Sequence, residues 1–145
     1  MKIDPEKAFE ILKKGNVLSF VNEKFEGRGR DISHIYVLLN TPVGGSLILV
    51  MVHASSKIDR IKTEPPETLI YVGPNEYSEL TKSTVFNCNV ITSMTKEEFV
   101  KKYNEDRISI KNDIDLSIVS NFQKGVLKSR KVESRFKKII KKEIE

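Results

Sequence analysis

The sequence has a single cysteine and no tryptophan. One cysteine cannot form a disulfide within the chain, which fits the reducing conditions of the cytoplasm. No apolar run approaches the roughly 20 residues that a membrane-spanning helix requires. The first residues, MKIDPEKAFEILKK, include acidic side chains and no signal-peptide core. We therefore expect a cytoplasmic protein that is not embedded in a membrane.

The chain also lacks the motifs that announce a cofactor. It contains no P-loop, no dinucleotide-binding fingerprint and no zinc-ligand spacing. Its two histidines, His34 and His53, are too few for a metal site, and no carboxylate stands at a convincing spacing from them. We expect neither a metal ion nor a cofactor.

Charge is plentiful and unevenly placed. The 145 residues, 39% hydrophobic and 31% charged, suit one globular domain over 1–145. The net charge is +5, and residues 124–145 hold nine Lys or Arg against three acids. Such a basic segment attracts phosphate groups or an acidic protein partner, although the solvated face of a lysine-rich helix has the same composition.

Short apolar runs separated by turn residues dominate the middle of the chain. Because parallel strands would need helical crossovers between them, we expect one strongly curved antiparallel sheet. Five short strands with tight turns favour a mainly β fold, a small antiparallel barrel. The expected strands are 17–21, 34–41, 46–55, 68–72 and 83–91.

Helices are expected at both ends of this barrel. Asp4-Pro5 is a typical helix start, and Gly15 should end the first helix. Thr95 and Glu98 form a capping box, which opens a helical C-terminal extension over about 95–145.

The strongest local signal is a hairpin, in which SHIYVLLN and SLILVMVHASS flank Gly44-Gly45. If these glycines are the central turn residues, His34 faces Ser55; a longer loop would place His34 opposite His53. Side chains alternate with period two, so both registers give the same faces. The first face carries Ile35, Val37, Leu39, Ile48, Val50, Val52 and Ala54, and the second carries His34, Tyr36, Asn40, Met51, His53 and Ser55.

These runs resemble the PemK/MazF family of toxin endoribonucleases. The matching segments are GNVLSFV, SHIYVLLN after a Gly/Arg loop, LILVMVHASS and KSTVFNCNVIT, within about Gly15 to Ser93. The resemblance implies an SH3-like barrel core over about 15–93. Two departures are typical of a divergent branch. His34-Ile35 stands where the family has Arg-Pro, and Ser55 stands where the family has threonine.

The resemblance further implies a toxin-type RNA-binding protein that cleaves RNA without a metal ion. Such cleavage needs a base for the 2′-OH proton, an acid for the leaving 5′-oxygen and a donor for the phosphate oxygens. His34 and His53 suit the first two tasks because imidazole titrates near neutral pH, and Ser55 suits the third. The simpler interpretation is that both histidines are solvated or bonded to backbone, in a non-catalytic barrel that binds nucleic acid or a protein partner.

RNA contacts are expected from the neighbouring residues. Arg28 and Arg30 can hold the phosphate backbone, because guanidinium groups bind phosphate with two parallel hydrogen bonds and the glycines between them permit close approach. Tyr36 can stack on a base, and Ser56 extends the site next to Ser55. An ordinary solvated turn and a packed tyrosine are the structural alternatives.

Association with other proteins is also expected. The apolar side of VESRFKKIIKKEI must pack against something, and proteins of the family that the chain resembles are commonly homodimers, so we expect a symmetric dimer. The same resemblance implies an acidic antitoxin as a protein partner. The lone Cys88 is expected to be a buried, inert residue rather than a nucleophile.

Overall fold

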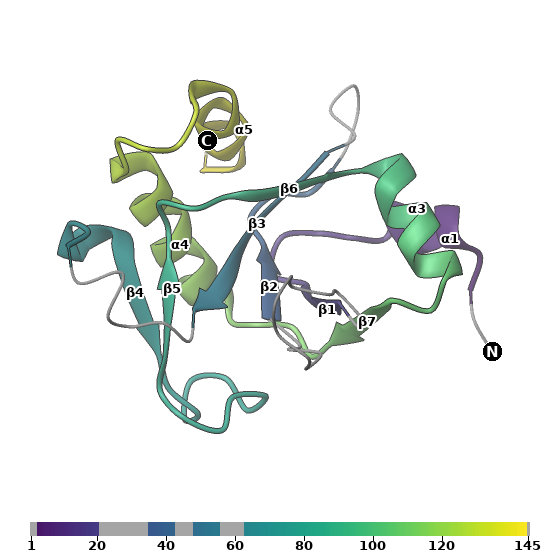
Figure 1. The fold of residues 1–145 in the computed structure, drawn as a ribbon, viewed down its shortest axis with the longest axis horizontal. Helices are drawn as coiled ribbons and strands as arrows, with labels where there is room; N and C mark the ends of the chain where they lie inside the picture. Colours follow the sequence, from purple (N-terminus) through teal and green to yellow (C-terminus); the bar gives the residue numbers. More distant parts are fainter. Residues whose placement is uncertain (1–2, 21–34, 43–47, 56–62, 145) are drawn as a thin grey trace, which may run out of the picture.

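The computed structural model of the chain describes residues 3–20, 35–42, 48–55 and 63–144, and these form one antiparallel sheet with helices around it (Figure 1). The strands among these residues are β1 (Val17–Phe20), β2 (Ile35–Leu38), β3 (Ile48–Ser55), β4 (Leu69–Val72), β5 (Thr84–Asn87), β6 (Thr92–Thr95) and β7 (Ile108–Lys111). The helices among them are α1 (Pro5–Glu10), α3 (Lys96–Asn104), α4 (Leu116–Lys128), α5 (Ser134–Ile144) and the short 3-10 helix η1 (Pro66–Thr68). The expected mainly β fold is confirmed.

The longest strand, β3, organises the sheet. Along the sheet the strands follow the order β4-β5-β3-β2-β1-β7, and β6 also pairs with β3. Every pairing is antiparallel, as the sequence predicts. The described strands form an open path from β4 to β7, so a closed SH3-like barrel stays a proposal.

The hairpin of β2 and β3 has the register that the glycine pair predicts. Tyr36 lies opposite His53, and Val37 lies opposite Val52. A two-residue turn centred on Gly44-Gly45, a pair outside the described residues, gives this register and not the longer-loop alternative. The alternation predicts that the first face is buried, and Val37, Leu39, Val50 and Val52 are fully covered, whereas Ile48 is only partly buried.

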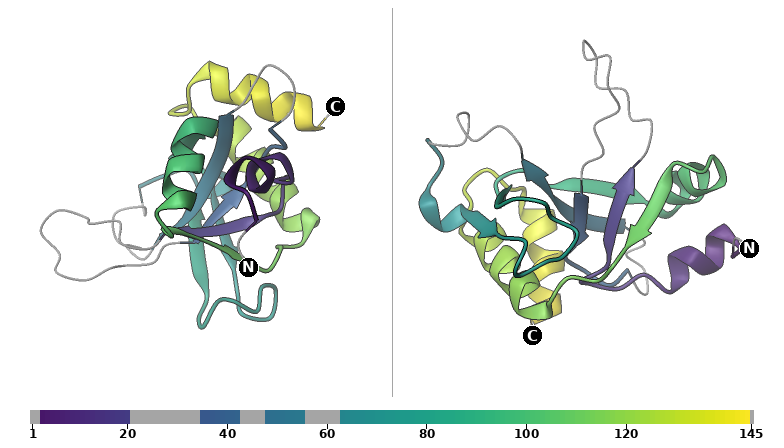
Figure 2. Two further views of the ribbon diagram at one scale, coloured as in Figure 1. Left: turned by 90° about the vertical axis from the view of Figure 1, so that its right-hand side faces the viewer. Right: turned by 90° about the horizontal axis from the view of Figure 1, so that it is seen from below.

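Both faces of the sheet are covered. On one face, apolar side chains of β1, β2 and β3 pack with those of α4 and α5, whereas on the other they pack with α1 and α3 (Figure 2). The second core was not predicted. It contains Ala8, Phe9, Leu12, Leu18, Phe20, Leu38, Leu49, Met51, Met94, Phe99 and Tyr103. Strands that are buried on both faces read as continuous apolar runs, as VLL and LILVMV do here.

The strand predicted over 83–91 is interrupted. Strand β5 ends at Asn87, and β6 resumes the pairing with β3 at Thr92. The turn between them is held by buried Asn89, whose Nδ2 donates to Thr68 Oγ1 at 2.7 Å and whose Oδ1 accepts from Ser129 Oγ at 2.6 Å. These bonds satisfy a buried amide that a regular strand would leave without partners.

The predicted helix boundaries are confirmed in part. The capping box is confirmed, since Glu98 N donates to Thr95 Oγ1 at 3.2 Å and Thr95 N donates to Glu98 Oε1 at 3.2 Å. Helix α1 begins at Pro5, as predicted, but it ends at Glu10 and not at Gly15. Gly15 instead has φ +93° and lies in the turn before β1.

The edge strand β7 lies in the segment expected to be helical. It pairs with β1 from Val17 opposite Lys111 to Phe20 opposite Ile108. The chain reaches this edge because Asp106 adopts φ 59°, a left-handed conformation that short polar side chains tolerate and that reverses the chain after α3.

Candidate functional site

Three rings form a row across neighbouring strands on the second face of the sheet. The ring centroids of Phe20 in β1 and Tyr36 in β2 lie 4.9 Å apart, with the rings nearly perpendicular at 71°. The centroid of His53 in β3 lies 5.4 Å from that of Tyr36. The row follows from the pairing, because Tyr36 is directly opposite His53 and Phe20 lies two residues beyond Leu18, the partner of Tyr36.

Phe20 is the most buried residue of this row. It is only 4% exposed, while Tyr36 and His53 are half-buried. The next residue on the same face of β3, Met51, is fully buried beneath the helices of the second core. His53 therefore lies at the border of that core, partly exposed as a residue but with its ring Nδ1 buried.

The sheet places some of the predicted site residues. Tyr36 and His53 are brought together, as their common face predicts. Ser55 is the last residue of β3, and its backbone lies opposite Val85. The remaining predicted residues lie outside the described part of the chain; they are Arg28, Arg30, His34 and Ser56.

Phe20 belongs to this row although it was not among the predicted site residues. Its edge contact with Tyr36 fixes the tyrosine ring, which in turn contacts the imidazole of His53. The spacing of Leu18 and Phe20, two residues apart in β1, indicates that both lie on one face of the strand. The β1–β2 register that brings Phe20 to Tyr36 cannot be predicted from the sequence.

Cys88 has no place in this chemistry. It is fully buried, and an ideal Cβ built on Gly125 of α4 would lie 2.9 Å from its Sγ. Burial raises the pKa of the Cys88 thiol to about 12, which opposes formation of the nucleophilic thiolate. The expectation of a buried cysteine is confirmed.

Among the described residues, no three His, Cys, Asp or Glu side chains come together in a way that could hold a metal ion. In the same ranges, no helix has the length and apolar character needed to cross a membrane. No protein-family model matches the chain, and no curated protein gives a significant match. The function is therefore inferred from the residues themselves.

Proposed function

We propose that this chain is a PemK/MazF-like RNA-binding protein of toxin type that cleaves RNA without a metal ion. The observation that carries the proposal is the position of His53. Its imidazole lies at the border of the second core, in contact with the ring of Tyr36 on the adjacent strand. A proton-transfer group needs this combination of fixed orientation and access to substrate.

The proposed reaction needs two proton transfers. One imidazole takes the proton of a ribose 2′-OH, and the 2′-oxygen attacks the adjacent phosphorus. The bond from phosphorus to the 5′-oxygen breaks, and the second imidazole gives that oxygen a proton. The products are a 2′,3′-cyclic phosphate and a 5′-hydroxyl. We assign the two roles to His34 and His53.

The other predicted residues would bind the substrate. The hydroxyl of Ser55 donates to a phosphate oxygen in this proposal, and Ser56 lies beside it in the sequence. Arg28 and Arg30 hold the backbone through charge-assisted hydrogen bonds. Tyr36 contributes a ring on which a base can stack, because every base offers a π-face to an aromatic side chain.

The sheet supports this assignment by holding the site rigidly. Val37 and Val52 are paired across β2 and β3 and fully buried on the first face. Leu38 and Met51 are paired and fully buried on the second face. Because these neighbouring residues are packed on both faces, the backbone that carries Tyr36 and His53 is fixed, and the ring contacts from Phe20 to Tyr36 and from Tyr36 to His53 orient the side chains.

The test is cleavage of a mixed-sequence RNA in EDTA. Replacing a general acid or base typically lowers the rate by 10²–10⁴-fold, so His34→Ala and His53→Ala should each fall in about that range. Ser55→Ala should lose less, because it removes one hydrogen bond to the phosphate. Full activity in both histidine variants would contradict the catalytic assignment.

Binding is tested separately by titrating RNA at several salt concentrations. Tyr36→Ala should weaken binding, whereas Tyr71→Ala, a tyrosine 59% exposed on β4, serves as the matched control and should not. Arg28→Ala combined with Arg30→Ala should reduce the salt dependence, because phosphate contacts act through charge. RNA binding without cleavage by the wild type would favour a non-catalytic barrel.

The proposed partners are a second copy of the chain and an acidic antitoxin, in the cytoplasm. One argument for the dimer is corrected by the structure. The apolar side of α5 is already covered within the chain, because Phe136 and Ile140 belong to the first core. The dimer therefore rests on the resemblance alone. Light scattering that shows only the 16.6 kDa monomer at micromolar concentration would contradict it.

A further inference from the structure

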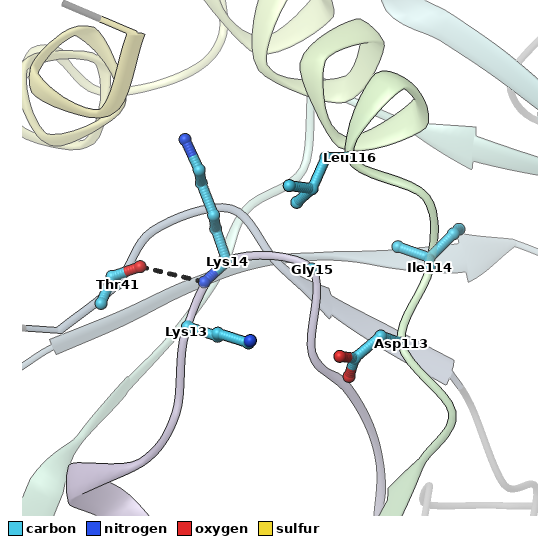
Figure 3. Close-up of a pocket in the computed structure, with 7 residues that line it drawn as sticks. All are labelled: Lys13, Lys14, Gly15, Thr41, Asp113, Ile114 and Leu116. Atoms are coloured by element: carbon cyan, nitrogen blue, oxygen red, sulfur yellow. Dashed lines mark hydrogen bonds between the residues drawn. The ribbon is translucent and has the colours of Figure 1, made fainter.

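A surface cavity of about 290 Å³ lies away from the row of rings, where the turn before β1 meets the segment that leads into α4 (Figure 3). Its volume is close to the lower limit of small-molecule pockets, about 300 Å³. Three separate segments of the chain, at residues 13–15, 41 and 113–116, supply its walls. The lining residues are Lys13, Lys14, Gly15, Thr41, Asp113, Ile114 and Leu116.

Backbone hydrogen bonds fix the walls of this cavity. Gly15 N donates to Leu38 O at 3.0 Å, and Ile114 N donates to Gly15 O at 3.0 Å. Lys14 N donates to Thr41 Oγ1 at 3.1 Å, as Figure 3 shows. The turn before β1 is thereby tied both to the end of β2 and to the segment before α4. A ligand would meet a preformed site, which lowers the entropic cost of binding.

The polar lining carries a net positive charge. Lys13 and Lys14 contribute two cations and Asp113 one anion. Asp113 Oδ1 already accepts from Asn16 Nδ2 at 2.9 Å. Lys14 Nζ donates to the carbonyl of Glu143 at 3.4 Å, which leaves its charge uncompensated. Neither lysine has an ion-pair partner among the described residues.

The apolar part of the lining includes an exposed leucine at the start of α4. Leu116, the first residue of α4, is 57% exposed although the rest of the apolar side of that helix is buried. Its Cδ2 lies 3.1 Å from an ideal Cβ built on Gly15, so this leucine packs tightly on the turn and presents its remaining surface to the cavity. A ligand with an apolar part would remove that surface from water.

We propose that this cavity binds a small organic carboxylate, with its anionic group at Lys14 and Thr41 and its apolar part on Leu116. The hydroxyl of Thr41 accepts from a backbone amide and keeps its own proton to donate to the carboxylate. The site is independent of RNA cleavage, because none of its residues belongs to the proposed reaction.

Hexanoate is the probe, followed by NMR through the methyl signals of Leu116 and the amide signal of Gly15. Hexanoate should shift both signals in a saturable way. Acetate, which lacks the chain, and hexanol, which lacks the charge, should both bind more weakly. The absence of a saturable shift with hexanoate, or equal affinity for hexanol, would overturn the proposal.

Variants separate the two parts of the site. Lys14→Gln should weaken hexanoate about tenfold or more, since hydrogen bonds to charged groups are the strong ones. Lys138→Gln, an equal change of charge on the exposed side of α5, should leave binding unchanged. Leu116→Ser should weaken hexanoate but not acetate. Equal loss in Lys14→Gln and Lys138→Gln would show that only net charge matters and would overturn the proposal.

Discussion

The contact between Gly125 and Cys88 gives a stability prediction that can be worked out in detail. Gly125 lies within α4, where alanine is ordinarily the better residue by about 1 kcal/mol. The Cβ of an alanine there would lie 2.9 Å from Cys88 Sγ and 3.1 Å from Cys88 Cβ. Helix propensity therefore favours alanine at this position, whereas packing against Cys88 opposes it.

The packing effect should be the larger one. Forcing extra atoms into a packed core typically costs about 1–3 kcal/mol, because the surroundings must shift. Cys88 is fully buried and cannot swing into solvent. After the propensity gain is subtracted, Gly125→Ala should lower the free energy of unfolding by about 1 kcal/mol.

The assay is urea unfolding of a double-mutant cycle. Cys88→Ala removes Sγ and leaves the 3.1 Å contact with Cβ, which a shift of a few tenths of an ångström relieves. In that background Gly125→Ala should be neutral or stabilising, which gives a coupling of about 1–2 kcal/mol. Asn121→Ala, at an exposed position of α4, reports propensity alone and should stabilise by up to about 0.7 kcal/mol. Equal stabilisation by Gly125→Ala in both backgrounds would refute the close contact.

Three further predictions concern buried polar groups and the thiol. Asn89→Ala should destabilise by about 2–3 kcal/mol in urea unfolding, because it removes the bond from Ser129 within the core. Asn40→Ala should cost about 1–3 kcal/mol in the same assay, because Val50 N, which donates to Asn40 Oδ1 at 2.8 Å, loses its partner. Cys88 should resist a thiol reagent at pH 8 until urea unfolds the chain. Rapid labelling of Cys88 in the folded chain would contradict this expectation. Burial raises the pKa of Cys88 from 9.0 to about 12, so between these values only the unfolded state ionises. The stability contributed by this thiol should therefore fall as the pH rises from about 9 to 12.

The local signals predicted much of the sheet. The Gly44-Gly45 step and the alternation of the flanking residues gave the register of β2 and β3, since both are short-range features. The capping box at Thr95 gave the start of α3 for the same reason. The sharing of one face by Tyr36 and His53 was predictable from period two alone.

The remaining features depend on contacts between distant segments. Strand β7 has four residues, too few for a periodic signal, and its pairing with β1 depends on the turn at Asp106. The end of β5 at Asn87 reflects hydrogen bonds from Asn89 to Thr68 and from Ser129 to Asn89, residues 21 and 40 positions away. The cavity near Lys14 is assembled from separate segments and has no signature within any one of them.

In the proposed mechanism, an imidazole pair activates a ribose 2′-OH without a metal ion. The ends of the RNA fragments that the protein produces in EDTA distinguish this chemistry from other cleavage reactions. We expect 2′,3′-cyclic phosphates and 5′-hydroxyls, and no cut at a position where the ribose carries 2′-hydrogen in place of the hydroxyl. Cleavage at such a deoxy position, 3′-hydroxyl ends, or no cleavage of RNA by the wild type would contradict it.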